Sequence, residues 1–297
     1  MPTDREATIR ELARAHGLEI SGTVTVNELG LDFQVAIAEA ADGLSWVLRI
    51  PRRPDAANRA AVEGRFLSAI APHLSVAVPD WQIHTAELIA YPLLPGDPGL
   101  TIDERGGPRW HFDVESPPEY AASLGNFLAE LHTVDPALVR DSGIPELSPA
   151  EVRQHKREDI DRVVCEFEVA PELSRRWNQW LDDDSYWPTF TTVTHGEVYP
   201  AHQLMDGPTN LSILDWTTAA ISDPARDFMF HRASVSAAAF EATIAHYVQA
   251  GGRVWPRFAD HCAELYSTSP VELGLFALQT GDPELLSAAR AQLNPSD

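Results

Sequence analysis

The stretch that decides the fold reads His-Gly-Glu-Val-Tyr-Pro-Ala-His-Gln-Leu at residues 195–204, and Ile-Leu-Asp-Trp follows at residues 213–216. One carboxylate, Glu197, comes shortly after a histidine, and a second histidine, His202, lies five residues further on. Another carboxylate, Asp215, ends a short apolar run. Phosphoryl transfer needs a carboxylate to orient the attacking hydroxyl and ligands that hold a metal ion against the phosphates. The order and spacing of these side chains match that requirement.

The composition limits the classes of protein that the chain can belong to. Its 297 residues indicate one large domain or two lobes, and 44% hydrophobic residues are enough for a proper core. The net charge is −22, from 44 acidic and 22 basic residues, so the surface repels nucleic-acid backbones and we exclude a DNA or RNA partner. Such a charge suits a cationic ligand, but it also simply confers solubility.

The two cysteines, Cys165 and Cys262, lie in unlike settings, so we expect no disulfide framework and a reducing compartment. The first residues, Met-Pro-Thr-Asp-Arg-Glu, do not form a basic and apolar leader, and no apolar run has the length of a membrane span. We therefore expect a cytoplasmic protein without membrane contact. We also expect it to be a monomer.

The first part of the chain predicts a strand-rich lobe. Alternating and β-branched residues, separated by turn signals such as Ala-Asp-Gly, are typical of antiparallel hairpins. The expected elements, in chain order, are a helix at 3–16, strands at 20–28, 33–39 and 44–50, a helix at 56–70, and strands at 81–84 and 87–94. The Pro/Gly-rich stretch 92–99 then reads as a linker, which places the lobes at 1–94 and 95–297.

The second part of the chain predicts helices around the motif at residues 195–204 and 213–216. Apolar residues recur there at helical spacing. The expected helices cover 119–134, 149–167, 173–181, 224–232, 237–249, 255–266, 270–279 and 284–293, with short strands on either side of residues 207–208. The fold class is therefore α+β, with a five-stranded antiparallel amino-terminal lobe that carries one helix and a helical carboxy-terminal lobe.

Three residues of the first lobe are candidates for binding a nucleotide. Gly30, between the first two strands, would let the backbone approach phosphates, although a lone turn glycine also fits a plain structural role. Arg49 in the third strand would bind α- and β-phosphates, and Glu63 in the following helix would fix its direction. The alternative for Arg49 is an exposed side chain on a surface strand.

The motif at 195–204 and 213–216 contains the candidate catalytic base and the candidate metal ligands. Glu197 would accept a hydrogen bond from the acceptor hydroxyl and take up its proton, or it is a solvated turn residue. Asp215 is well placed to hold a metal ion against β- and γ-phosphate oxygens. His202 is the second candidate ligand, although Mg²⁺ prefers oxygen and a lone histidine is usually structural.

Other polar residues near the motif have plainer interpretations. Asp223 and Pro224 fit the start of a helix, and Asp227 could reach back and brace the catalytic loop. His195 reads as a hydrogen-bonding support for the loop backbone. The chain contains no G-x-S-x-G nucleophile elbow and no Cys/His cluster with zinc spacing, so we exclude those two kinds of catalytic site.

These residues are similar to those of a known family. The chain resembles the macrolide 2′-phosphotransferases, a branch of the aminoglycoside-phosphotransferase and protein-kinase-like superfamily. The kinase-like motif marks the superfamily, whereas Trp-Val-Leu-Arg-Ile-Pro-Arg-Arg at 46–53 and Gly-Gly-Arg-Val-Trp-Pro-Arg at 251–257 resemble the macrolide branch. Further matching runs lie at 31–35, 78–81, 87–92, 180–185 and 214–216.

The resemblance implies a bilobal protein-kinase-like fold and an activity. The γ-phosphate of GTP or ATP would be transferred to the 2′-hydroxyl of the macrolide amino sugar, which inactivates the antibiotic. His202 and Asp215 would hold Mg²⁺, with Mn²⁺ as the alternative ion. Arg49 and Glu63 would correspond to the ion pair between the third strand and the helix. The hinge that reads the purine edge through backbone groups would comprise the following residues: Ala90, Tyr91 and Leu93.

One position departs from the family pattern. The family motif reads His-Gly-Asp, and this chain has Glu197 at the Asp position. The added methylene moves the carboxylate by roughly 1 Å, and a misplacement of that size can cost about a hundredfold in rate. The macrolide would bind in a groove of the helical lobe walled by 224–240 and 268–280, with Trp216, Phe228 and Asp227 as candidate contacts.

Two other functions fit the same sequence. The first is a kinase of the same fold that phosphorylates another small alcohol, such as an aminoglycoside or a metabolite. The second is a protein that binds a macrolide but turns it over weakly, because Glu197 replaces the usual Asp. The runs at 46–53 and 251–257 favour the macrolide over the first alternative.

Overall fold

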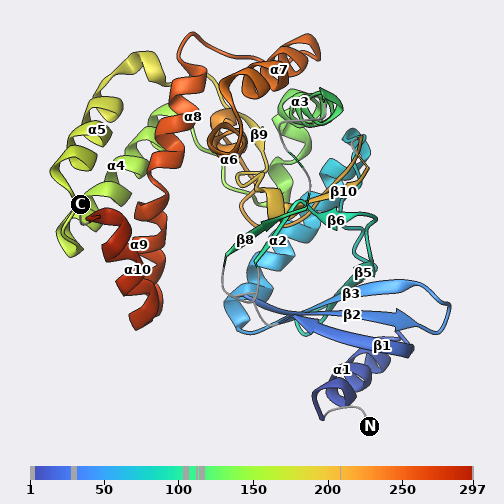
Figure 1. Ribbon diagram of the computed structural model, residues 1–297. Helices are drawn as coiled ribbons and strands as arrows, with labels where there is room; N and C mark the ends of the chain where they lie inside the picture. Colours follow the sequence, from blue (N-terminus) through green and yellow to red (C-terminus); the bar gives the residue numbers. More distant parts are fainter. Residues whose placement is uncertain are drawn as a thin grey trace. The chain divides into compact units, whose positions relative to one another are not determined.

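The computed structural model describes residues 4–27, 32–102, 107–111, 113, 118–207 and 209–295 (Figure 1). Its contacts divide the chain into two units. Unit 1 comprises Met1–Phe112, Ala137–Ile144 and Ala201–Thr218, and unit 2 comprises Asp113–Pro136, Pro145–Pro200 and Ala219–Asp297. The units thus interleave along the sequence, and a single division of the lobes at 94/95 stays a prediction.

Unit 1 is built on a five-stranded antiparallel sheet with the strand order β1-β2-β3-β5-β4. Its strands are β1 (Ile20–Asn27), β2 (Phe33–Ala40), β3 (Ser45–Pro51), β4 (Ile83–His84) and β5 (Ile89–Pro92). The turn between β2 and β3 contains Gly43 at a φ of 82°, a left-handed conformation that favours glycine. The predicted sheet is confirmed, with β4 and β5 shorter than expected.

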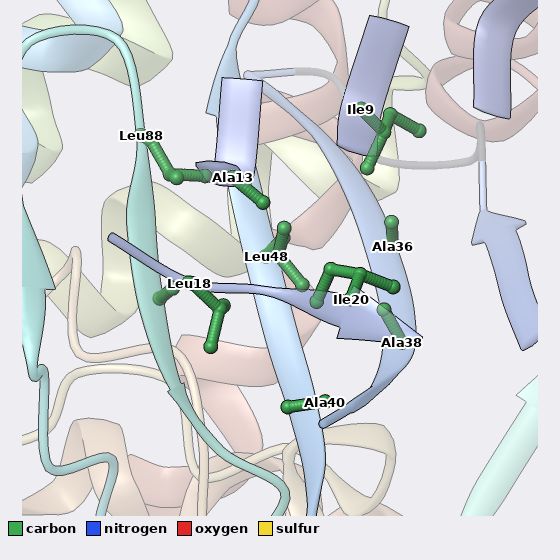
Figure 2. Close-up of a cluster of buried hydrophobic side chains, with 10 residues drawn as sticks. Ile9, Ala13, Leu18, Ile20, Ala36, Ala38, Ala40, Leu48 and Leu88 are labelled. Atoms are coloured by element: carbon green, nitrogen blue, oxygen red, sulfur yellow. The ribbon is translucent and has the colours of Figure 1, made fainter. Parts of the chain in front are cut away.

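A helix covers each face of this sheet. On one face, Ile9 and Ala13 of α1 (Asp4–Ala15) gather with Leu48 and with small side chains of β2, as Figure 2 shows. On the other face, α2 (Pro54–Ile70) packs its alanines against an apolar cluster that includes Val47. Successive strand residues point to opposite faces. Arg49, two residues after Val47, therefore points towards α2.

The segment expected to be a linker is part of a second sheet in unit 1. In that sheet β6 (Asp97–Pro98) pairs with β10 (Gln203–Asp206), which pairs in turn with β11 (Asn210–Ile213). Gly96 has a φ of +98°, and a Cβ there would lie 2.7 Å from the Met205 backbone, so the close approach requires glycine. The hairpin of β7 (Leu100–Ile102) and β8 (Pro108–Trp110) follows. The linker prediction missed these pairings because they are non-local.

Unit 2 is mainly helical, as predicted. Its helices are α3 (Pro118–Thr133), α4 (Pro149–Glu166), α5 (Pro171–Asp182), α6 (Met229–Ser234), α7 (Ala237–Gln249), α8 (Phe258–Ser267), α9 (Ser269–Thr280) and α10 (Pro283–Leu293). Two strands, β9 (Thr192–Thr194) and β12 (Ala220–Ser222), pair antiparallel and lie before and after the motif at 195–216 in the chain. A capping box between Ser148 and Glu151 begins α4. None of the described helices is long and apolar enough to cross a membrane.

The helices expected at 224–232 and 255–266 have other bounds in the structure. The stretch 224–232 is a short 3₁₀ turn, η6 (Pro224–Asp227), followed by α6, and the Asp223 side chain caps η6 by accepting a hydrogen bond from the Ala225 N–H. Helix α8 begins at Phe258, because the preceding residues form a turn. The other 3₁₀ turns are η1 (Ala71–His73), η2 (Pro136–Leu138), η3 (Arg140–Ser142), η4 (Asp184–Tyr186) and η5 (Pro200–His202).

A buried histidine in unit 2 predicts acid sensitivity of the fold. The His231 side chain is buried, and its Nε2 lies 2.8 Å from the Thr243 hydroxyl. Burial lowers the pKa of His231 from 6.5 to about 4. The unfolded chain binds this proton more readily, so the stability contributed by neutral His231 is present above pH 6.5 and is lost as the pH falls towards 4. The loss amounts to about 3 kcal/mol.

Urea unfolding of the native protein and of His231→Gln at about pH 7.5 and about pH 4.5 measures this loss. We expect the native free energy of unfolding to fall more steeply on acidification than that of the variant, by up to about 3 kcal/mol. Equal pH dependence of the two proteins would show that His231 does not titrate in this range.

Candidate functional site

A buried ion pair lies on the α2 face of the sheet in unit 1. The Arg49 Nη1 atom donates to Glu63 Oε1 at 2.9 Å, with side chains 10% and 0% exposed. The guanidinium also stacks over the rings of Phe33 and Trp81, at 4.3 and 5.4 Å from their centroids. This burial excludes the interpretation of Arg49 as an exposed strand residue.

The charge of this pair is set by its surroundings. Burial alone would lower the pKa of Arg49, but Glu63, Tyr91 and Asp215 raise it above its ordinary value, so the guanidinium stays protonated. Burial raises the pKa of Glu63, and Arg49 opposes that shift. The interaction with Asp215 indicates that this carboxylate lies within the electrostatic reach of the pair.

The β10–β11 hairpin brings His202 and Asp215 together in unit 1. The Leu214 N–H donates to the His202 carbonyl at 2.8 Å, and the His202 Nε2 and Asp215 Oδ2 atoms are 3.8 Å apart. Asp215 has a φ of 60°, the one positive value outside glycine among the described residues. Its Oδ1 accepts from the Thr217 hydroxyl at 2.6 Å. Left-handed backbone of this kind is uncommon and concentrates at functional sites.

The chemistry of these two side chains fits a divalent cation. Mg²⁺ is commonly held by one or two carboxylates together with phosphate oxygens and waters, so a complete protein cage is unnecessary. Asp215 is 41% exposed and His202 is 22% exposed, which leaves both accessible to an ion. Within the described ranges no three metal-binding side chains cluster together. Asp215 is the main candidate ligand, because imidazole is softer than Mg²⁺ prefers.

The candidate hinge lies in β5 and just after it. Ala90 and Tyr91 are buried between β3 and β4, and Leu93 is 41% exposed. The Leu93 N–H donates to the Ser45 carbonyl at 2.8 Å, so this donor is committed to the sheet. A purine contact through the Leu93 N–H is therefore inconsistent with the structure, and the remaining hinge groups stay predictions. The candidate Gly30 lies outside the described residues.

Unit 2 contains the loop that carries Glu197. The Asp227 carboxylate accepts hydrogen bonds from two consecutive backbone N–H groups, those of His195 at 2.9 Å and Gly196 at 2.5 Å. The His195 Nδ1 atom accepts from the Glu197 N–H at 3.2 Å, and the Glu197 carbonyl accepts from the Tyr199 N–H at 2.7 Å. The backbone on both sides of Glu197 is thus fixed, and His195 supports the loop as expected.

The Asp227 side chain stabilises this loop and is too buried to contact a ligand. The residue is 1% exposed, and its Oδ2 lies 3.0 Å from the His132 Nε2 atom. Burial would raise the pKa of Asp227, but His132 and the loop lower it below its ordinary value, so the carboxylate stays ionised. Direct contact with an acceptor requires an exposed group, which corrects the expectation that Asp227 is a substrate contact.

The two candidate aromatic contacts are also buried. Phe228 is 0% exposed, and the rings around it are those of Phe240, Tyr247 and Phe258. In unit 1, Trp216 is 1% exposed, and its indole N–H donates to the Ile213 carbonyl. Both side chains belong to apolar cores and have no free surface for a ligand. The sequence does not indicate which way these side chains point, and both are buried.

A different aromatic row lies beside Glu197 in unit 2. The Tyr199 and Phe230 ring centroids are 5.1 Å apart, and those of Phe230 and Tyr266 are 6.0 Å apart. Tyr266 is 43% exposed. Burial raises the pKa of Tyr199, and Tyr266 and Glu197 add to this shift. Glu197 lies two residues before Tyr199 in the chain. This row could not be predicted from the sequence, because its three residues are far apart in the chain and only Tyr199 is part of the motif.

Comparison with known proteins places the chain in a family. The model of the phosphotransferase enzyme family matches residues 23–261, which is more than half of the chain. The chain belongs to this phosphotransferase family. It therefore has the kinase-like fold that the sequence predicted, with an antiparallel sheet in one part and helices in the other.

Three similar proteins narrow the comparison. The crystal structure of macrolide 2′-phosphotransferase MphH from Brachybacterium faecium, an apoenzyme, is 52% identical, with 98% of both chains covered and a TM-score of 0.92. A structure described as macrolide 2′-phosphotransferase type I is 40% identical, covers 100% of this chain and 99% of its own, and has a TM-score of 0.93. The uncharacterized protein YcbJ of Bacillus subtilis (strain 168) is 39% identical over 94% of this chain and 92% of its own.

Proposed function

We propose that this phosphotransferase transfers the γ-phosphate of GTP or ATP to the 2′-hydroxyl of the amino sugar of macrolides, and so inactivates the antibiotic. The observation that carries the acceptor class is the 52% identity to a macrolide 2′-phosphotransferase over 98% of both chains. The candidate groups belong to different units, with Arg49, His202 and Asp215 in unit 1 and Glu197 in unit 2.

On the donor side, Arg49 would bind the α- and β-phosphates. Its ion pair with Glu63 and its stacking on Phe33 limit the directions that the guanidinium can take. Asp215 and His202 would hold Mg²⁺ or Mn²⁺, which when bound neutralises the charge of the phosphates. The Asp215 carboxylate is kept in place by its hydrogen bond from Thr217.

On the acceptor side, Glu197 would accept a hydrogen bond from the 2′-hydroxyl. As the bond between the hydroxyl oxygen and the γ-phosphorus forms, the bond from the γ-phosphorus to the oxygen that bridges to the β-phosphate breaks, and GDP or ADP is the leaving group. The proton of the 2′-hydroxyl passes to the Glu197 carboxylate. Asp227 accepts hydrogen bonds from the N–H groups of His195 and Gly196, the two residues before Glu197, and so holds the loop from which the longer side chain extends. A fixed loop is needed because transfer depends on orientation.

We assign the macrolide contact to the row formed by Tyr199, Phe230 and Tyr266. A macrolide is a large apolar ring with one ammonium group on its amino sugar, so aromatic faces beside a carboxylate suit both parts of it. All three aromatic residues lie in unit 2 with Glu197. This assignment replaces the buried Trp216 and Phe228.

Truncation of the middle aromatic residue tests this contact. We expect Phe230→Ala to raise the KM for the macrolide about tenfold, because a lost apolar contact of about 1.4 kcal/mol corresponds to that factor. The KM for the nucleotide should not change. The control is Leu12→Ala on α1, which removes another partly buried apolar side chain outside the row and outside the expected groove walls at 224–240 and 268–280. An unchanged macrolide KM in Phe230→Ala would place the acceptor elsewhere.

The reaction itself is tested by mass spectrometry. Incubation with GTP or ATP, Mg²⁺ and an erythromycin-like or azithromycin-like macrolide should add about 80 Da, the mass of one phosphoryl group, to the drug. An aminoglycoside should gain no phosphate under the same conditions. Phosphate on the aminoglycoside and on no macrolide would favour the first alternative kinase. Binding of the drug without any turnover would favour the weakly active binding protein.

We also propose that the protein acts as a monomer in the cytoplasm, where GTP and ATP are available as donors. The acidic surface, with 44 acidic against 22 basic residues, supports the absence of a nucleic-acid partner. Light scattering after size-exclusion chromatography tests the monomer, since a dimer would show twice the chain mass of 32.7 kDa.

A further inference from the structure

The Gly-Gly-Arg-Val-Trp-Pro-Arg turn at 251–257 is the conspicuous motif to which the proposed function gives no role. The turn follows α7 and folds back onto Tyr247. The Gly252 N–H donates to the Tyr247 carbonyl at 2.8 Å, and a Cβ on Gly252 would lie 2.3 Å from the Tyr247 ring. The turn therefore restricts the position of the tyrosine ring, which carries the hydroxyl.

A continuous chain of buried hydrogen bonds leads from this hydroxyl to the catalytic loop. The Tyr247 hydroxyl lies 2.8 Å from the His132 Nδ1 atom, and the His132 Nε2 atom lies 3.0 Å from Asp227 Oδ2. Asp227 accepts from the N–H groups at 195 and 196. Tyr247, His132 and Asp227 are 0%, 6% and 1% exposed. All of these residues belong to unit 2.

The direction of the hydrogen bond between His132 and Asp227 follows from the ionised Asp227. A carboxylate only accepts, so the His132 Nε2 atom carries the proton that it donates. In the neutral form of His132 the Nδ1 atom accepts from the Tyr247 hydroxyl, and in the protonated form it donates to the hydroxyl oxygen, so the hydroxyl is its partner in both forms. Removal of this hydroxyl leaves a buried ring nitrogen without its partner, which frees the ring of His132 to turn.

The same turn also contacts a second set of buried hydrogen bonds, which lies at the Asp223 end of η6. The Trp180 indole N–H donates to His261 Nδ1 at 3.0 Å, and His261 Nε2 donates to Asp223 Oδ2 at 2.7 Å. Trp255 of the turn packs its ring 5.6 Å from that of His261 and donates its indole N–H to the Tyr186 carbonyl at 2.6 Å. Both ends of η6 are therefore supported by a buried histidine that the turn helps to place.

We propose that the turn at 251–257 is a positioning element for the catalytic loop, and that Tyr247 and His132 are positioning residues which act through Asp227. This inference rests on the proposed function. Together, the turn and these residues hold the two N–H groups before Glu197 in one arrangement. The Glu197 carboxylate then meets the acceptor hydroxyl in a productive geometry. Neither Tyr247 nor the turn needs to touch the nucleotide or the macrolide.

Two hydroxyl deletions on α7 test the proposal. Tyr247→Phe removes the hydroxyl that reaches His132, and Thr243→Val removes the hydroxyl that reaches the equally buried His231. We expect Tyr247→Phe to lower kcat by about 10- to 100-fold with both KM values unchanged, because a misplaced base costs rate without costing affinity. Thr243→Val should retain the native kcat. Equal kcat in both variants would overturn the proposal.

A second measurement does not depend on activity. Hydrogen exchange of the free protein, followed by mass spectrometry, should show at least about tenfold faster exchange for the amides of His195 and Gly196 in Tyr247→Phe but not in Thr243→Val. Gly252→Ala, which displaces the tyrosine ring, should give the same result. Unchanged exchange in Tyr247→Phe would overturn the positioning role. If the native protein phosphorylates no macrolide, the proposed function fails, and the exchange result still decides whether the turn positions the loop.

Discussion

Glu197→Gln is expected to lower kcat for phosphate transfer by about 10²- to 10⁴-fold, the usual contribution of a general base. The amide keeps the size and hydrogen-bonding shape of the side chain, but it cannot take up the proton of the 2′-hydroxyl. The backbone of the loop is held by Asp227 and His195, so the substitution should leave the fold unchanged. Steady-state kinetics with GTP and an erythromycin-like macrolide measure the effect, and both KM values should stay close to native.

Glu197→Asp is the matched control, because it restores the residue of the family motif and retains a carboxylate. The shorter side chain still accepts a proton, so its loss of kcat should be smaller than that of Glu197→Gln. Its cost through misplacement is limited to about a hundredfold. Full activity in Glu197→Gln would exclude Glu197 as the base. A higher kcat in Glu197→Asp than in the native protein would show that the added methylene slows the reaction.

Asp215→Asn is expected to lower kcat by about 10³-fold and to raise the Mg²⁺ concentration needed for half-maximal activity. A metal ion contributes several kcal/mol to the stabilisation of charge in the transition state, and about 1.4 kcal/mol corresponds to a factor of ten. The asparagine side chain tolerates left-handed backbone, so the φ of 60° at this position can be kept. Titration of activity with Mg²⁺ and with Mn²⁺ provides the measurement.

Asp206→Asn is the control for this charge change, because Asp206 is an exposed residue of the same hairpin at the end of β10. It removes one negative charge from unit 1 without touching Asp215 or His202. Its kcat and its Mg²⁺ requirement should match those of the native protein. If Asp215→Asn behaves like Asp206→Asn, the metal ion is held by other groups.

Much of the fold could be predicted because its signals are local. The alternation of residues in β1 to β3 and the apolar stripe of α2 follow from periods of two and 3.6 residues, which any short window reveals. The pairing of Arg49 with Glu63 could also be expected, from the resemblance to kinases, and the two side chains do form an ion pair of 2.9 Å. The role of Arg49 in binding phosphates stays a prediction.

The parts that escaped prediction depend on contacts between distant segments. The pairing of Asp97–Pro98 with β10 joins residues about a hundred positions apart, and no local pattern indicates it. His132 is separated from Asp227 by 95 positions and from Tyr247 by 115. Phe228 is expected to line the acceptor groove as part of the wall at 224–240, but it is 0% exposed, because burial is decided by the surrounding helices.

The tight fit of Gly252 against Tyr247 bears on how resistance genes are judged from DNA sequence. A methyl group at Gly252 would overlap the ring, which lies 2.3 Å from the position of such a Cβ. On the positioning role proposed above, a single-nucleotide change to alanine in this codon would leave the reading frame intact but impair the product, although every residue proposed to meet the drug or the nucleotide is unchanged. Genomic surveillance that scores only ligand-contacting positions would count such an allele as a functional resistance determinant.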